Sequence, residues 1–328
     1  MCAMFSHIYV EERAKGFPMT EKILSKFNDS TVVSIRHYKD VFNRPGQDPC
    51  IQNGSKNLIL AVNEGRKIFE ASPVCQDFGM GKFYYVESAM NCVFSCDYCF
   101  LKGMYATSNI VIFVNSDDYL MECMEQLKKG PLYLCASYDT DLGALSGICD
   151  WQNIWENFAL ETPDLTVELR TKSVIRDIVS APNIIYAFTL SPQEVISRFE
   201  KCTPALDARI DCVNQAIAKG ASVRLCFDPL IYINNFELCY NEFVDKILQS
   251  IDLTRVRDIS IGTFRISSDY LPNLRKACPD SSAVLFPFDR EDGFCVYPAD
   301  LRERMAGIIL NELKKAGHGN KIYINNSK

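Results

Sequence analysis

The stretch that decides the fold reads Asn91-Cys92-Val93-Phe94-Ser95-Cys96-Asp97-Tyr98-Cys99-Phe100. Its three cysteines have C-x3-C-x2-C spacing, so a compact loop can direct three thiolates toward one centre. Thiolates select zinc, copper(I) or iron–sulfur clusters. Zinc sites usually have four ligands, often as two C-x2-C pairs, and no second pair or His-x3-His completes this triplet. The triplet therefore predicts a [4Fe–4S] cluster with one iron left open for a substrate or cofactor. The alternative is a chance triplet of buried cysteines.

The rest of the chain is large enough for a full hydrophobic core. It has 328 residues, of which 48% are hydrophobic, which permits one large domain or a main domain with an appendage. Its 15 cysteines are scattered and odd in number, which fits a reducing cytosol better than a disulfide scaffold. No apolar run reaches the roughly 18 residues of a membrane span, and the first residues lack a signal-peptide pattern. We therefore expect a cytoplasmic protein without membrane contact. The net charge of −6 gives no overall nucleic-acid signature.

Strand and helix patterns on both sides of the triplet predict the architecture. Residues 1–78 read as a small α/β appendage, with strands at 8–10, 31–35 and 58–62 and a helix at 20–27. From residue 83 onward short apolar strands alternate with helices. We predict strands at 83–87, 110–114, 132–135, 165–169, 184–190, 222–227 and 256–262, and helices at 117–129, 151–160, 173–179, 206–219 and 237–251.

This alternation indicates a parallel sheet covered by helices. Six or so β/α units are too few to close an eight-unit barrel. We therefore expect an α/β fold whose core, residues 79–265, is an open partial (β/α)6 barrel with its ligand at the C-terminal ends of the strands. A C-terminal extension, residues 266–328, would add a helix at 299–315 and a last strand at 321–324.

The triplet, with an aromatic residue after its last cysteine, is the signature of the radical S-adenosylmethionine (SAM) superfamily. Within that superfamily the chain resembles the spore photoproduct lyase family over most of its length. The segments that carry the resemblance are Ile8-Tyr9-Val10-Glu11-Glu12-Arg13-Ala14, the loop from Cys92 to Leu101, Cys135-Ala136-Ser137, Arg170-Thr171-Lys172, and Thr203-Pro204-Ala205-Leu206-Asp207-Ala208-Arg209-Ile210. The loop is shared by the whole superfamily, whereas the other segments narrow the match to this family.

The resemblance implies a partial barrel of the radical SAM type and a DNA-repair reaction. The open iron would bind the amino and carboxylate groups of SAM, and one electron from the reduced cluster would cleave SAM to a 5′-deoxyadenosyl radical. That radical would remove a hydrogen from the methylene-bridged thymine dimer of ultraviolet-irradiated spore DNA, and a protein thiol would return a hydrogen after the dimer splits. The implied partners are damaged DNA and an electron donor such as a flavodoxin or ferredoxin. The implied location is the cytoplasm of the spore core.

The resemblance also assigns cofactor residues. The cluster ligands would be Cys92, Cys96 and Cys99, and the residues near SAM would be Tyr98, Ser137, Lys172 and Thr189. Lys172 would pair with the SAM carboxylate; the alternative is a solvated lysine at a strand end. The two hydroxyl residues could instead bond to backbone, and Tyr98 could simply pack in the core.

The thiol that returns the hydrogen is less clearly marked. Cys135 is our first choice, since it ends a predicted strand beside the proposed site, although free cysteine also serves as a small core hydrophobe. Cys75, in the turn before the strand at 83–87, is the second choice, and a plain loop cysteine is its alternative. The family commonly has a hydrogen-relaying tyrosine directly after the last cluster cysteine. Here Phe100 takes that position and has no hydroxyl to give.

Contact with DNA would need local basic groups in the C-terminal third. The candidates are Arg265, Arg275, Lys276, Arg290, Arg302 and Arg304. Residues 286–294 predict a hairpin that turns at Asp292-Gly293, although it is more acidic than the family's basic hairpin. A solvated face of mixed charge is the alternative. Two other functions stay open: a radical SAM relative acting on another nucleic acid or a small molecule, and a non-enzymatic metal-binding protein.

Overall fold

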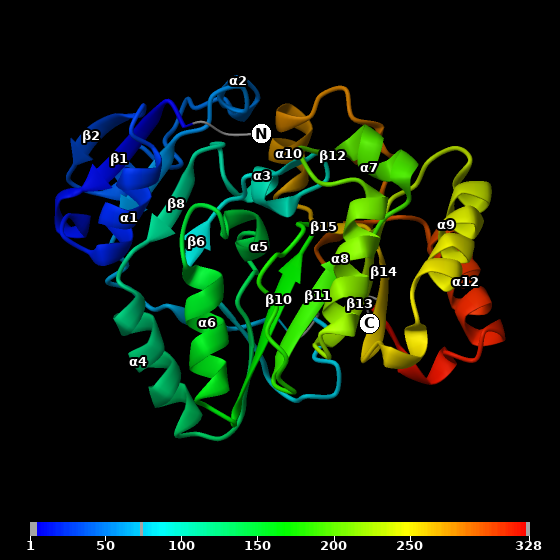
Figure 1. Ribbon diagram of the computed structural model, residues 1–328. Coiled ribbons are helices and arrows are strands. Elements are labelled where there is room, and N and C mark those ends of the chain that lie inside the picture. The colour runs from blue at the N-terminus through cyan, green and yellow to red at the C-terminus, as the bar shows by residue number, and fades with distance from the viewer. Residues whose placement is uncertain (1–4, 73–74, 326–328) are drawn as a thin grey trace.

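The structure, a computed structural model, describes residues 5–72 and 75–325. The predicted turn before the strand at 83–87 includes Pro73 and Val74, which lie outside the described residues. The chain forms a large barrel-like sheet with helices on its outer side and a smaller sheet beside it (Figure 1). Among the described residues, no helix is long and apolar enough to cross a membrane.

The large sheet has eight strands in the described residues, in the order β18-β14-β13-β11-β10-β9-β5-β4. Six consecutive parallel members are β5 (Phe83–Val86), β9 (Leu132–Cys135), β10 (Leu165–Thr171), β11 (Ile184–Thr189), β13 (Ser222–Leu230) and β14 (Asp258–Thr263). At the edges, β18 (Ile322–Ile324) is parallel to β14, and β4 (Ile68–Glu70) is antiparallel to β5. In the described residues no pairing joins β4 to β18. The predicted open partial barrel is therefore confirmed.

Amphipathic helices cover the outer face of this sheet (Figure 1). They are α4 (Ser116–Leu127), α6 (Trp151–Leu160), α7 (Gln193–Phe199), α8 (Leu206–Ala218), α9 (Phe236–Ser250) and α12 (Ala299–Lys315). In α8 the buried residues Leu206, Ile210, Val213 and Ile217 follow the three- and four-residue spacing of one helix face. Burial of such faces against the sheet stabilises each β/α unit.

The helix predicted at 173–179 is wrong, because residues 172–183 contain no helix. Tertiary hydrogen bonds take the place of helical ones in this segment. The N–H of Ile175 donates to Cys212 Sγ at 3.2 Å, and the N–H of Val179 donates to Tyr186 Oη at 2.8 Å. The chain thus passes from β10 to β11 through a loop that bonds to its neighbours.

The smaller sheet has five strands in the described residues, in the order β2-β1-β3-β8-β6. They are β1 (His7–Glu11), β2 (Thr31–Ile35), β3 (Leu58–Ala61), β8 (Ile110–Phe113) and β6 (Ala89–Met90). Helix α1 (Pro18–Lys26) lies beside them and the short α2 (Pro49–Gln52) precedes β3. The two sheets do not divide at residue 78. Strands β6 and β8, which follow this residue, join the smaller sheet, whereas β4, which precedes it, joins the barrel. A domain boundary at 78–79 and another at 265–266 stay predictions.

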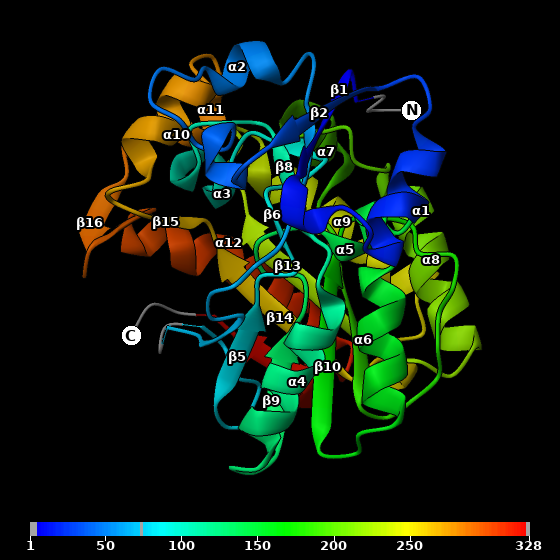
Figure 2. The same ribbon diagram turned by 90° about the vertical axis from the view of Figure 1, so that its left-hand side faces the viewer.

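The cysteine loop lies between the two sheets. It contains β7 (Ser95–Cys96), which pairs antiparallel with β12 (Glu200–Lys201), and leads into α3 (Phe100–Met104). Figure 2 shows α3 together with α2, α10 (Leu271–Ala277) and α11 (Ser282–Leu285) at one end of the molecule. The contact between α3 and α10 is close enough that a Cβ at Gly103 would lie 2.7 Å from the Tyr270 Cβ. The loop is therefore held between rigid neighbours.

The C-terminal extension forms a three-stranded antiparallel sheet of β15 (Arg265–Ser267), β17 (Phe294–Val296) and β16 (Asp289–Glu291). The predicted hairpin is confirmed: β16 turns into β17 through Asp292 and Gly293, whose φ angles are 47° and 82°. Two successive positive φ values are what the favoured type I′ hairpin turn requires. The short α5 (Leu142–Leu145) lies on the barrel, against β10.

Candidate active site

A cavity of about 330 Å³ opens at the C-terminal ends of the barrel strands. Side chains from the cysteine loop form one wall, and residues at the ends of β9, β10, β11, β13 and β14 form the others. Every candidate site residue lines this cavity, namely Cys75, Cys92, Cys96, Tyr98, Cys99, Cys135, Ser137, Lys172 and Thr189. The structure thus brings them together, and the role of each stays a prediction.

Hydrogen bonds and a strand pairing fix the cysteine loop at both ends. The loop begins at Asn91, which has a φ of 70° and whose side-chain Nδ2 donates to the carbonyls of Thr107 at 2.8 Å and Asn109 at 3.0 Å. Further along, Cys96 pairs with Glu200 in the β7–β12 ladder, and the N–H of Asp97 donates to the carbonyl of Phe199 at 2.7 Å. Asparagine tolerates the left-handed region better than most residues. The loop can therefore turn sharply and present its cysteines to the cavity.

The donor chemistry of the three loop cysteines suits a [4Fe–4S] cluster. Burial raises the pKa of Cys92 to about 12 and raises that of Cys96 well above its usual range, so metal binding would release protons. Within residues 5–72 and 75–325 no group of three or more His, Cys, Asp or Glu side chains is gathered tightly enough for one metal ion. In a [4Fe–4S] cluster each cysteine would bind a different iron, and all three cysteines line this cavity.

A buried polar network supports the loop from behind. Tyr98 Oη donates to Glu200, and Glu200 also accepts from Ser191 Oγ at 2.9 Å and from Arg209 at 2.5 Å. Burial alone would raise the pKa of Glu200, but the charges of Arg209 and Lys172 outweigh it and hold that pKa below its usual range. Both partners of the ion pair are almost fully buried, with side-chain exposures of 0% for Glu200 and 1% for Arg209. The network locks the position of Tyr98.

Lys172 is held by its backbone while its side chain remains available. Its N–H donates to Asp141 Oδ2 at 2.8 Å, and Thr171 Oγ1 donates to the other oxygen of the same carboxylate at 2.7 Å. The Lys172 ammonium lies 5.7 Å from the centre of the Tyr98 ring. In the described part of the chain, no acidic side chain forms an ion pair with it. An anionic ligand group in the cavity would complete its contacts.

Three cavity hydroxyls point to a polar ligand. The Oγ of Ser137, Oγ1 of Thr140 and Oγ of Ser260 are buried without a hydrogen-bond partner in the described residues, and all three residues line the cavity. Buried polar groups almost always have partners. A cofactor or substrate with several hydrogen-bonding groups would supply them.

Both candidate thiols face the cavity, in different surroundings. Cys135 ends β9 and is 2% exposed. Cys75 Sγ lies 3.8 Å from Tyr138 Oη. The ring of Tyr138 stacks on Tyr85, with centroids 4.3 Å apart, and lies 5.9 Å from the ring of Phe100. Sequence reasoning missed Tyr138, which places a phenol close to the position where Phe100 lacks one.

Sequence reasoning also missed a group of buried charged residues that includes one residue of the cavity wall. Arg170 donates through Nε to Glu168 Oε1 at 3.0 Å and lines the cavity. Arg224, which is fully buried, bridges Glu168 and Asp258. The sequence does contain a signal for these residues. Polar and apolar residues alternate along β10, whereas a buried parallel strand is ordinarily apolar throughout. Of these charged residues Arg170 lines the cavity, so its guanidinium can donate hydrogen bonds to acceptor atoms of a substrate.

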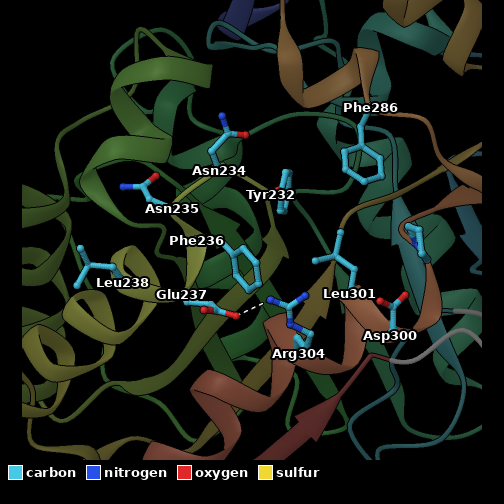
Figure 3. Close-up of a pocket in the computed structure, with 11 residues that line it drawn as sticks. Tyr232, Asn234, Asn235, Phe236, Glu237, Leu238, Phe286, Asp300, Leu301 and Arg304 are labelled. Carbon is cyan, nitrogen blue, oxygen red and sulfur yellow. Dashed lines mark hydrogen bonds and ion pairs between the residues drawn. The ribbon is translucent and has the colours of Figure 1, made fainter.

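Most of the predicted DNA-contact residues are engaged within the protein. Arg304 pairs with Glu237 at 2.5 Å in a separate hollow of about 510 Å³, which Phe236 and Phe286 also line. Figure 3 shows this ion pair beside Phe236. Arg302 pairs with Glu291 at 2.7 Å. The others divide between the inside and the surface: Arg275 bonds to the carbonyls of residues 284 and 286, Arg265 lines the active-site cavity, and Lys276 and Arg290 are exposed.

Comparisons with known proteins point to one family. Residues 4–268 match the family model described as spore photoproduct lyase. The chain is 22% identical to spore photoproduct lyase of Bacillus subtilis over 253 residues, which covers 73% of this chain and 72% of the relative. It is also 22% identical to spore photoproduct lyase of Clostridium acetobutylicum over 334 residues, which covers 94% of this chain and 95% of the relative.

Solved structures give the same fold. A double mutant of spore photoproduct lyase with bound AdoMet and dinucleoside spore photoproduct superposes with a TM-score of 0.83 at 16% identity, covering 100% of both chains. A spore photoproduct lyase complexed with dinucleoside spore photoproduct also gives a TM-score of 0.83 at 16% identity, covering 99% of both chains. These likenesses establish that the barrel and its flanking elements follow one common arrangement.

Proposed function

The chain belongs to the spore photoproduct lyase family, and from this membership we propose that it is a radical SAM lyase that reverses spore photoproduct to two thymines. The observation that carries the proposal is the composition of one cavity. In the described residues, the three loop cysteines line one wall, and a lysine without an ion-pair partner and three hydroxyls without hydrogen-bond partners line the others. This arrangement suits a cluster on one side and a polar cofactor with its substrate on the other.

We assign the cofactor-binding roles as follows. Cys92, Cys96 and Cys99 would hold the cluster. The ammonium of Lys172 would hold the carboxylate of SAM, and Ser137 would give its hydroxyl to the same cofactor. When bound, the [4Fe–4S] cluster and SAM supply the hydrogen-abstracting radical chemistry.

The remaining residues of the cavity orient and shield the reacting atoms. Tyr98 is fixed by Glu200 and presents its ring to Lys172. The rings of Phe100 and Tyr138 close one side against water, which protects a reactive intermediate. We assign the return of a hydrogen atom to the thiol of Cys135, with Cys75 as the second candidate. A thiol suits this step because an S–H bond is weak enough to give a hydrogen atom to a carbon radical.

The partners follow from the reaction. The substrate would be ultraviolet-damaged DNA carrying spore photoproduct. Reduction of the cluster needs a low-potential electron donor, such as a flavodoxin or ferredoxin. The cytoplasm of the spore core is the compartment where this lesion would be met, and a reducing compartment also suits a chain with 15 cysteines.

Anaerobic incubation of the reconstituted, reduced protein with SAM and a dinucleotide spore photoproduct tests the proposal. We expect release of thymine that depends on SAM, on reductant and on the cluster cysteines. Cleavage of SAM without release of thymine would instead favour a related enzyme acting on another nucleic acid or a small molecule. A protein that binds zinc and never cleaves SAM would favour the non-enzymatic alternative.

A further inference from the structure

Lys56 connects the N-terminal sheet to the cysteine loop. It lies just before β3, and its Nζ donates to three successive carbonyls of the loop: Cys92 at 3.1 Å, Val93 at 2.9 Å and Phe94 at 3.0 Å. The contacts span 36 to 38 residues of sequence. They fix the first proposed cluster ligand and the two residues after it with a single side chain.

Three carbonyl acceptors match the three N–H donors of the charged form of this lysine, although burial lowers the pKa of its ammonium. An ammonium group has three N–H donors, whereas a neutral amine has two and could not satisfy all three oxygens. Hydrogen bonds from a charged donor are shorter and stronger than neutral ones. The three carbonyls therefore point together at Lys56, and Cys92 and Phe94 of the same loop line the cavity.

The charge of Lys56 is not cancelled by an acid. The two other lysines at this loop, Lys102 and Lys201, both approach the carboxylate of Asp97, at 4.0 Å and 3.1 Å. Among the described residues no Asp or Glu lies within ion-pair distance of Lys56. Carbonyl dipoles stabilise the ammonium but leave its net charge in place, in direct contact with the loop whose cysteines line the cavity.

We propose that Lys56 is a positioning residue for the cluster, which holds the loop in its cluster-binding conformation and favours reduction by placing a fixed positive charge beside it. The inference rests on the proposed cluster at the three loop cysteines. Reduction adds one negative charge to a cluster, so a nearby cation stabilises the reduced state more than the oxidised one. Removing the cation should therefore lower the reduction potential.

The test compares three variants of Lys56 by iron content and by the midpoint potential of the reconstituted protein without substrate. Lys56→Met removes both charge and donors, Lys56→Gln removes the charge but keeps N–H donors, and Lys56→Arg keeps both. In the two neutral variants we expect the equilibrium constant for reduction of the cluster to fall at least tenfold. For a one-electron couple this corresponds to a midpoint potential at least 59 mV lower. Lys56→Arg should stay close to the parent.

A matched control is available on the far side of the barrel. Lys321 Nζ also donates to three carbonyls, those of Leu253 at 3.1 Å, Thr254 at 2.8 Å and Val256 at 2.7 Å. Lys321→Met removes the same kind of contact away from the loop, so iron content and potential should match the parent.

Each outcome decides the proposal. Full iron content and an unchanged potential in both neutral variants would overturn it. If neither neutral variant holds a cluster, recovery of the cluster in Lys56→Arg supports the proposal and failure of that variant contradicts it. A parent protein that binds no iron–sulfur cluster would instead refute the proposed function itself. A parent that holds a cluster but does not repair the lesion leaves this measurement valid.

Discussion

Lys172→Ala should weaken SAM binding while leaving the fold intact. The Lys172 ammonium has no acidic partner in the described residues and lies 5.7 Å from the Tyr98 ring. Loss of a cation–π contact at that distance costs about 0.5–2 kcal/mol. The backbone bond of residue 172 to Asp141 does not involve the side chain. The variant should therefore lose no more than about 0.5–2 kcal/mol of unfolding free energy.

The loss in SAM affinity should be larger than the loss in stability. A hydrogen bond to a charged group contributes about 1.5–3 kcal/mol, and each 1.4 kcal/mol changes a dissociation constant about tenfold. Removing the contact with the SAM carboxylate should thus raise Kd by about one to two orders of magnitude. Lys172→Met, which keeps most of the aliphatic chain, should show the same increase, because the effect arises from the charge and not from packing.

Calorimetric titration of SAM into the anaerobically reconstituted protein measures this directly. Lys201→Ala is the matched control: its ammonium also lies by the cysteine loop, 3.1 Å from Asp97, but its side chain is 62% exposed. That variant should bind SAM like the parent. If Lys172→Ala and Lys172→Met also bind SAM with the parent's affinity, Lys172 is a solvated lysine at a strand end and the assignment is wrong.

Three further predictions concern the same cavity. Replacing any one of the cluster cysteines by alanine should abolish the iron–sulfur absorbance, and normal SAM cleavage in such a variant would refute the ligand assignment. Cys135→Ala should still open the lesion but yield by-products at the expense of thymine, whereas Cys75→Ala should behave like the parent. Mass analysis of the products measures this. By-products from Cys75→Ala and not from Cys135→Ala would show that the roles of the two thiols are reversed. Glu200→Gln leaves Arg209 buried without its counter-charge and should cost about 3–5 kcal/mol in urea unfolding at pH 7, against less than about 1 kcal/mol for the exposed control Glu194→Gln. Because the folded-state pKa of Glu200 lies below its usual range, its contribution is fully present above the unfolded-state pKa of about 4.3 and is lost as the pH falls through the folded-state pKa, so the gap between parent and Glu200→Gln should close in acid.

The barrel and the cysteine loop were predictable because each follows from local spacing. The alternation of strands and helices predicted a parallel sheet, although the strand predicted at 110–114 joins the smaller sheet as β8, and the Asp292-Gly293 pair predicted the turn between β16 and β17. The helix predicted at 173–179 failed because tertiary acceptors, the sulfur of Cys212 and the hydroxyl of Tyr186, take its N–H groups. Nothing in the local sequence shows that such partners are within reach.

The supporting residues of the site could not be predicted for a similar reason. Lys56 belongs to a polar segment with no periodic pattern, and its carbonyl acceptors are 36 or more residues away. Arg209 is different, because it lies in the stretch at 203–210 that carried the family resemblance, yet its buried partner Glu200 is apparent only in the folded chain. Long-range pairs of this kind arise from the packing of whole β/α units against the loop.

The most direct test of the account is to give the reduced protein SAM and a dinucleotide spore photoproduct that is fully deuterated on its bases, and to weigh the 5′-deoxyadenosine that forms. We expect that thymine is released and that 5′-deoxyadenosine carries deuterium taken from the lesion. Formation of 5′-deoxyadenosine without deuterium and without thymine would show that the radical does not act on this lesion, and would contradict the proposed function.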